Sequence, residues 1–529
     1  MTTTPRLTLF ALGLYVFLVY FYLLARFNGS FIEADTSAQT SIIFEAQRAD
    51  SILYSGRPYS NGLSYTAVSL FIIDMTGLTI QQLQVIVWPL LTVFLTVVLF
   101  VTYRALTGST NIALLASLFI FLQPDFLFVT WRGSHERITW LFTLLLLFCI
   151  FRSFAHLRTL SGVARFIIMF YLFAMALVAT NTLFASSFMV GLIVSFAAGY
   201  VFLQVRGLLN RSTDADLKKQ LLRLLYAAVV VAILIYIFIF YVYPPARNSL
   251  QELVGAANKV AVLTLNTEPA TQETFNPYAA FISFQLQVYL VLTIFSWSIL
   301  AVAGLGWLKN GLGFLNRKRL TSDALPKIVF WLTFTAYGVQ LAGAIFADRS
   351  GALTGNLQVR LFTPFNLLVM PLAAATIWEL FQRLKGKLLR RVFFALGMAA
   401  VGWFSAASVL KTSIDPLVGY KWIFNTEPEK IAENWIIAHV PDGSSIWAGF
   451  DERMTQGANF NNLDINSRDI LFFYSNSPDP ISTYYLFSTI EEMRWIQLGR
   501  PLLNLDAEDR IYDNGTGIVY RRYPRTPYQ

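Results

Sequence analysis

Three groups of polar residues stand out in a chain that otherwise consists of long apolar runs. Glu33 and Asp35 are carboxylates spaced two residues apart, soon after the first apolar run. His135 and Glu136 are adjacent between two later runs, and Arg360 begins another run. Carboxylates act as general bases or as ligands of hard divalent cations, and histidine is a common metal ligand. Arginine can hold a phosphate through two parallel hydrogen bonds.

Each group also has a purely structural interpretation. Asp35 could serve only to favour the dipole of a helix that starts beside it. Trp131 could anchor the second group at headgroup depth, with the charged residues around it paired locally. Arg360 could extend its guanidinium into lipid headgroups. Residue type alone leaves these alternatives open.

The composition identifies a polytopic membrane protein. Of its 529 residues, 56% are hydrophobic and only 13% are charged, and the mean hydropathy is +0.54. A soluble domain carries about 25% charged residues. The single cysteine, Cys149, excludes internal disulfides and cysteine-based zinc sites. No Gly-rich phosphate loop, zinc-protease helix or hydrolase nucleophile elbow is present.

The apolar runs predict eleven membrane spans, near residues 7–25, 82–103, 111–129, 138–151, 166–180, 184–203, 222–243, 279–307, 328–347, 360–382 and 392–410. With a cytoplasmic N-terminus, the inner segments hold twenty Lys and Arg residues, and the outer loops between spans hold nine. This bias follows the positive-inside rule. The net charge of +9 is therefore a topology signal, which argues against a nucleic-acid partner. The same topology puts all three polar groups at the outer face.

The first outer loop, residues 27–81, is predicted to contain two short helices. Thr36-Ser-Ala-Gln39 matches a capping box, so a surface helix is expected to start near Ser37, with Glu33 and Asp35 in non-helical backbone before it. Leu63 to Leu78 is apolar, but it spans about 16 residues and contains Asp74, whose burial at mid-bilayer is expensive. We therefore expect a re-entrant or interfacial helix there.

Two domains are predicted. Residues 1–410 form the membrane domain, and 411–529 form an extracytoplasmic α+β domain with a helix at Pro428–His439, a strand at Ser445–Gly449 and a hairpin around Asp513-Asn-Gly515. The outer loop 244–278 is long enough to be a lid or binding loop.

This order of elements resembles the GT-C superfamily of membrane glycosyltransferases, and most closely the catalytic subunit of oligosaccharyltransferase. In that family a catalytic aspartate follows the first span in a long outer loop, as Asp35 does here. A second acidic pair lies between spans three and four, where this chain has His135-Glu136. A basic residue near the start of a late span contacts the carrier phosphate, and Arg360-Leu-Phe-Thr-Pro is similar. The resemblance covers the layout of most of residues 1–385.

The resemblance implies transfer of a sugar from a polyprenyl-phosphate carrier at the outer face of the plasma membrane. Asp35 would be the base, with Glu33 as a second catalytic candidate, and Arg360 would bind the donor phosphate. Asp35, His135 and Glu136 would be the ligands of a divalent cation, Mn²⁺ or Mg²⁺, although the family's second acidic pair is two aspartates.

The acceptor differs from that of the family. Ser445-Ile-Trp-Ala-Gly-Phe-Asp451 stands where the family has the Trp-Trp-Asp-x-Gly motif that reads acceptor asparagines. Transfer to asparagine is therefore not expected, and the acceptor is predicted to be a lipid, a glycan or a different group of a protein. The rival readings are a transporter or flippase of lipid-linked sugars and a surface-glycan polymerase or ligase. Transporters often carry internal repeats and mid-membrane charges, and neither is visible here.

Overall fold

The structure is a computed structural model. It describes residues 4–26, 34–52, 62–155, 160–208, 215–247, 251, 283–316, 320, 324–349, 357–413, 426–449, 451–459, 468–473, 482–488, 491, 495–496 and 503–522. Glu33 lies outside these residues, and so does the predicted lid from 252 onward. Asp35 is described in its backbone but not in its side chain.

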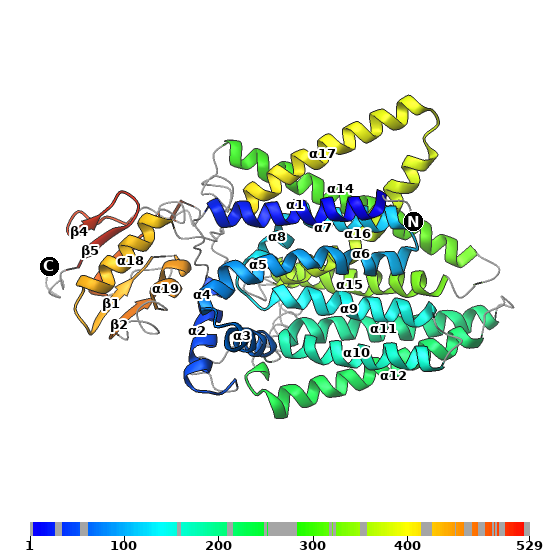
Figure 1. The fold of residues 1–529 in the computed structure, drawn as a ribbon, viewed down its shortest axis with the longest axis horizontal. Coiled ribbons are helices and arrows are strands. Elements are labelled where there is room, and N and C mark those ends of the chain that lie inside the picture. Colours follow the sequence, from blue (N-terminus) through cyan, green and yellow to red (C-terminus); the bar gives the residue numbers. More distant parts are fainter. Residues whose placement is uncertain are drawn as a thin grey trace, which may run out of the picture.

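The membrane domain is a bundle of long helices that lie side by side along the long axis of the molecule (Figure 1). Within the described residues, nine helical stretches are long and apolar enough to cross a membrane. Seven of them are the single helices α1 (Thr4–Arg26), α9 (Glu136–Ala155), α11 (Thr182–Leu208), α14 (Ser283–Asn316), α15 (Leu325–Arg349), α16 (Leu357–Arg383) and α17 (Lys387–Ser413). The eighth is continuous through α4 (Ile80–Gln82), η1 (Leu83–Val87), α5 (Trp88–Leu91), η2 (Thr92–Phe94) and α6 (Leu95–Thr107). The ninth is α12 (Ala215–Ile237) with η3 (Phe238–Val242).

The other two predicted spans are also helical, but each is modified. The third is a pair, α7 (Thr110–Phe121) and α8 (Pro124–Trp131), bent by 72°. The fifth is α10 (Leu160–Thr180), whose described apolar part is shorter than the other spans. The prediction of a polytopic helical membrane protein is confirmed.

The bend between α7 and α8 has a clear cause. Pro124 cannot continue the hydrogen-bond ladder of α7, so carbonyl groups at the break lack helical donors. The end of α17 packs on this break, where the Ser408 hydroxyl donates to the carbonyl of Leu122. The Thr412 hydroxyl adds a second bond, at 3.2 Å, to the carbonyl of Pro124 in the first turn of α8. The protein itself thus supplies a donor at the helix break, as a membrane protein requires.

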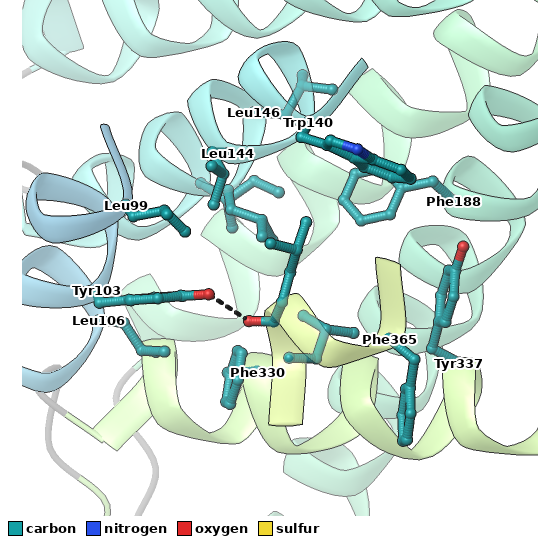
Figure 2. Close-up of a cluster of buried hydrophobic side chains, with 14 of the residues drawn as sticks. Leu99, Tyr103, Leu106, Trp140, Leu144, Leu146, Phe188, Phe330, Tyr337 and Phe365 are labelled. Atoms are coloured by element: carbon teal, nitrogen blue, oxygen red, sulfur yellow. Dashed lines mark hydrogen bonds between the residues drawn. The ribbon is translucent and has the colours of Figure 1, made fainter. Parts of the chain in front are cut away.

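The interior of the bundle is tightly packed with apolar side chains from α6, α9, α11, α15 and α16 (Figure 2). Pro371 interrupts α16 and provides no N–H for the carbonyl of Leu367, one turn earlier. The buried Tyr103 hydroxyl donates to that carbonyl at 2.9 Å, which is the dashed contact in Figure 2.

Two short helices run across one end of the bundle, which we call the α2 end (Figure 1). α2 (Ala34–Arg48) and α3 (Leu63–Thr76) pack against each other through apolar residues such as Ile43 and Ile73. The prediction of a short, non-spanning helix at 63–78 agrees with α3. The expected start of the first helix is wrong, because α2 begins at Ala34 and not near Ser37.

This earlier start places Asp35 in the first turn of α2 and removes Thr36 from the predicted capping box. An acidic residue type is favoured in the first turn of a helix, so a start before Asp35 suits the sequence as well as a start near Ser37. Thr36 is instead inside the helix, where its carbonyl accepts a hydrogen bond from the Thr40 hydroxyl at 2.6 Å.

The C-terminal region forms a five-stranded sheet in the order β2-β1-β3-β5-β4. Its elements are α18 (Glu427–His439), β1 (Ser444–Trp447), α19 (Glu452–Asn459), β2 (Ile470–Phe473), β3 (Tyr484–Phe487), β4 (Asp509–Asp513) and β5 (Ile518–Arg521). The predicted helix, first strand and hairpin are present. The parallel pairing of β1 with β2 and β3 was not predicted. This region lies beyond the α2 end, where α19 packs against α2 (Figure 1).

Candidate active site

The first turn of α2 is fastened to the turn between α8 and α9. The backbone N–H of Gly133 donates to the Thr36 hydroxyl oxygen at 2.9 Å. A Cβ atom on Gly133 would lie 2.6 Å from Thr36 Cγ2 and 2.9 Å from Gln84 Oε1. Only glycine fits such a close approach without displacing a neighbour. Asp35 precedes Thr36, so the backbone that carries the predicted base lies against the turn that carries His135 and Glu136.

Glu136 forms the acidic centre of that turn. Its carboxylate accepts a hydrogen bond from Arg132 at 2.8 Å within a salt bridge, and a second from the Ser134 hydroxyl. His135 Nδ1 lies 3.8 Å from the same carboxylate. The Glu136 side chain is 17% exposed, and it starts α9, where the helix dipole favours a negative charge. Glu136 is thus held as a paired carboxylate that remains partly accessible.

Arg137 is a buried guanidinium that closes two helix ends. It donates to the carbonyl of Gln84 at 3.0 Å and to the carbonyl of Trp131, the last residue of α8. Gln84 lies in the π-helical segment η1, where its carbonyl would be paired with residue 89. That residue is Pro89, which has no N–H, so Arg137 supplies the missing donor.

These contacts bear on the alternative in which this turn is only a headgroup anchor with locally paired charges. Trp131 is 1% exposed, so it is a buried side chain and not an anchor at the protein surface. Arg132 and Glu136 do pair locally, as that alternative proposed, but Arg137 binds backbone carbonyl groups. The buried Arg137 could not be recognised from sequence, because its partners are backbone atoms of distant segments.

Tyr65 and Gln84 extend the polar cluster toward α3. The Tyr65 hydroxyl donates to Gln84 Oε1 at 2.6 Å. Burial raises the pKa of Tyr65 to about 12, so this hydroxyl stays neutral and remains a donor. Neither residue was predicted from the sequence. The available signal was a glutamine within an apolar run, five residues before a proline.

Arg360 lies in the first turn of α16 and is exposed. The turn at 384–386 joins α16 to α17, whose end packs on α8, so α16 starts at the α2 end. No contact among the described residues joins Arg360 to the Glu136 turn. The predicted convergence of these residues with Asp35 stays a prediction, because the Asp35 side chain is not described.

The face of α16 that follows Arg360 is tightly packed. Arg360, Pro364, Leu367 and Leu368 share one face of α16 by their spacing of four, seven and eight residues. The last three pack with Thr143, Leu147, Phe184, Phe188 and Tyr337, and the space among these side chains does not admit a water molecule. Figure 2 shows Phe188 and Tyr337 within this packed interior. Arg360 therefore lies at the edge of an apolar interior that is closed in this structure.

The described residues do not complete a cation site. No three His, Cys, Asp or Glu side chains that the structure describes come together. Of the predicted ligands, His135 and Glu136 are neighbours, but both Glu136 oxygens already accept hydrogen bonds from Arg132 and Ser134. We therefore assign no chemical step to a metal.

Comparison with known proteins identifies the fold. No protein-family model matches the sequence, and no curated protein matches it. The structure resembles the archaeal oligosaccharyltransferase AglB from Archaeoglobus fulgidus, solved in complex with an inhibitory peptide and a dolichol-phosphate. The TM-score is 0.56 at 12% identity, covering 94% of this chain and 71% of that chain.

Two further solved structures are similar. The apo form of the Archaeoglobus fulgidus oligosaccharyltransferase also has a TM-score of 0.56 at 12% identity, covering 92% of this chain and 71% of that chain. ArnT from Cupriavidus metallidurans bound to undecaprenyl phosphate has a TM-score of 0.41 at 13% identity, covering 98% of each chain. The resemblance to the oligosaccharyltransferase confirms the predicted GT-C fold.

Proposed function

We propose that this chain is a glycosyltransferase that moves a sugar from a polyprenyl-phosphate carrier to an acceptor at the outer membrane face. The fold supports this class, and the similar oligosaccharyltransferase was solved with a dolichol-phosphate. The single observation that carries the proposal is the Gly133–Thr36 hydrogen bond. It fastens the helix turn bearing Asp35 to the turn bearing Glu136, which supports one acidic site built from two chain segments 97 residues apart.

In the proposed reaction the acceptor nucleophile attacks the anomeric carbon of the donor sugar. Asp35 accepts the proton of the nucleophile as the new glycosidic bond forms. The bond between the anomeric carbon and the phosphate oxygen breaks, and the carrier phosphate leaves with that electron pair. A single displacement of this kind inverts the configuration at the anomeric carbon. Arg360 stabilises the negative charge that develops on the departing phosphate.

The remaining predicted residues take supporting roles. Glu136 pairs with Arg132 and thereby holds the guanidinium cation beside the site. Glu33 is a second candidate for aligning the acceptor. The apolar tail of the carrier would lie in a groove between spans. The segment 244–278 would close over the bound substrates.

We place the α2 end outside the plasma membrane and the N-terminus in the cytoplasm. The distribution of Lys and Arg, twenty in the inner segments against nine in the outer loops, supports this orientation. The C-terminal sheet then lies outside, next to the site, where α19 rests on α2. A position between α2 and this sheet is suited to a lipid, glycan or protein acceptor.

The test is an assay of purified protein with labelled polyprenyl-phosphate-linked hexoses and pentoses. We expect loss of label from the carrier and its appearance on an acceptor added as membrane lipid, glycan or peptide. Parallel reactions with Mn²⁺, Mg²⁺ or a chelator decide whether a cation takes part. Movement of the labelled lipid across vesicles without cleavage of the sugar–phosphate bond would instead identify a flippase and contradict the proposal.

A further inference from the structure

Two glutamine side chains are buried at the α2 end with polar atoms that lack partners. Gln39 of α2 and Gln84 of η1 are each 1% exposed. Among the described residues, neither amide atom of Gln39 has a hydrogen-bond partner. Gln84 Oε1 accepts the Tyr65 hydroxyl, but Gln84 Nε2 has no partner within the described part of the chain.

Folding alone gives no reason for these amides. Buried polar groups in proteins are nearly always paired, and leaving one unpaired forfeits its hydrogen bonds to water. An apolar side chain of the same size would fill the space without that penalty. A role in catalysis or binding is one established reason for keeping such a group.

Both amides adjoin the proposed active site. Gln39 follows Asp35 by four residues, so the two share one face of α2. The Gln39 amide atoms lie 3.3 and 3.4 Å from the position that a Cβ on Gly62 would take, and His135 Cβ lies 3.6 Å from the same point. Gln84 Oε1 lies against Gly133, two residues before His135. The amides therefore flank the turn that carries His135 and Glu136.

We propose that Gln39 and Gln84 form a subsite for the hydroxyl groups of the transferred sugar. This inference rests on the proposed function. A sugar hydroxyl donates one hydrogen bond and accepts others, and an amide offers both an acceptor oxygen and N–H donors. The unpaired atoms are one acceptor and two donor nitrogens, all uncharged. They suit a neutral polyhydroxyl ring, whereas a phosphate calls for cations such as Arg360.

The subsite is tested by binding two probes to Gln39→Met, a substitution of similar length without polar atoms. The probes are a polyprenyl-phosphate-linked hexose or pentose, whichever the wild type binds more tightly, and polyprenyl phosphate without a sugar. We expect affinity for the sugar-bearing donor to fall about tenfold, the effect of one lost hydrogen bond, with unchanged affinity for the bare carrier. The melting temperature should stay the same or rise.

Gln220→Met is the matched control. Gln220 is equally buried, and its Oε1 also lacks a partner among the described residues, but its Nε2 contacts Ser153 in the membrane domain and it is not part of the proposed site. It should leave binding of both probes unchanged. Gln39→Asn, which keeps the amide but shortens the side chain, provides a milder variant and should show the same selective loss to a smaller degree.

The outcomes separate the inference from the proposed function. Wild-type affinity of Gln39→Met for both probes, or equal loss for both, contradicts the subsite and leaves the proposed function standing. Wild-type protein that binds neither probe contradicts the proposed function, and the subsite falls with it. Selective loss for the sugar-bearing probe supports both.

Discussion

The middle of the bundle and the α2 end use different side chains to satisfy a helix carbonyl that a proline leaves without a donor. In each region a proline removes the N–H that a helix carbonyl needs, at Leu367 before Pro371 and at Gln84 before Pro89. In the middle, the neutral Tyr103 hydroxyl closes the gap among apolar side chains. At the α2 end, the charged Arg137 closes it among other polar groups.

The difference extends beyond the two prolines. The α2 end brings together an ion pair, a buried guanidinium and two amides with unpaired atoms. Within the described residues, the bundle also holds unpaired buried atoms, such as Trp140 Nε1 and Asn366 Nδ2, but these are spread along its helices. In the proposal above, the cluster at the α2 end serves a polar ligand, whereas the apolar middle serves stability.

A large loss of transfer is expected on substitution of Arg360, which stands where the two regions meet. Arg360→Leu should reduce transfer by about 10² to 10³, because it removes a charge that stabilises the leaving phosphate. Melting temperature should be unchanged, since the side chain is exposed. The matched control is Arg383→Leu at the far end of α16, which pairs with Glu379 on the surface and should retain full activity. Equal activity of both variants would exclude Arg360 from the site.

The comparison predicts a larger stability loss at Arg137 than at Tyr103. Arg137→Met leaves two buried carbonyl groups unpaired and should lower the free energy of unfolding by about 3 kcal/mol. Tyr103→Phe leaves one carbonyl unpaired and should lower it by about 1 kcal/mol. Unfolding in a denaturing detergent series would measure both. Equal losses of unfolding free energy would contradict the larger contribution expected from Arg137.

The fit between α2 and the α8–α9 turn is tested at Gly133. Gly133→Ala puts a methyl group within 3 Å of both Thr36 and Gln84, and overpacking of this kind costs about 1 to 3 kcal/mol. Transfer should fall with stability, since the turn bearing Asp35 moves. Gly343→Ala, where the added methyl group meets no atom within 4 Å, should leave transfer unchanged and should not lower stability. A harmless Gly133→Ala would contradict the close fit.

The smallest expected effect comes from the hydrogen bond itself. Thr36→Val keeps the size of the side chain and removes the acceptor for the Gly133 N–H. We expect a loss of about 1 kcal/mol in stability and a fall in the transfer rate greater than the fall in donor affinity. Thr40→Val, one turn further along α2, removes only an intrahelical bond and serves as the control. Identical kinetics of the two variants would show that this bond does not position the base.

The sequence was sufficient for the architecture because spans and short strands leave strong local patterns. Apolar length identified the eleven helical segments, and the Asp-Asn-Gly turn identified the hairpin of β4 and β5. The start of α2 was misplaced, since Thr36-Ser-Ala-Gln39 has the sequence of a capping box although the helix already begins at Ala34.

The site was only partly visible in the sequence. Asp35, His135, Glu136 and Arg360 were proposed from charges at span ends, and the Arg132–Glu136 pair follows from i, i+4 spacing on one short stretch. The contact of Gly133 with Thr36 joins residues 97 positions apart, and no local pattern encodes it. The parallel pairing of β1 with β2 and β3 was missed for the same reason, because it joins distant segments.

The most direct test of the account compares Asp35→Asn with Asp74→Asn in the transfer assay. Both changes replace a carboxylate by an amide of the same shape near the α2 end, but Asp74 is an exposed residue of α3 outside the proposed site. The account predicts that Asp35→Asn lowers the transfer rate by about 10² to 10⁴ with normal donor binding, as expected for loss of a general base. Asp74→Asn should transfer at the wild-type rate. Undiminished transfer by Asp35→Asn would contradict an active site at the α2 end.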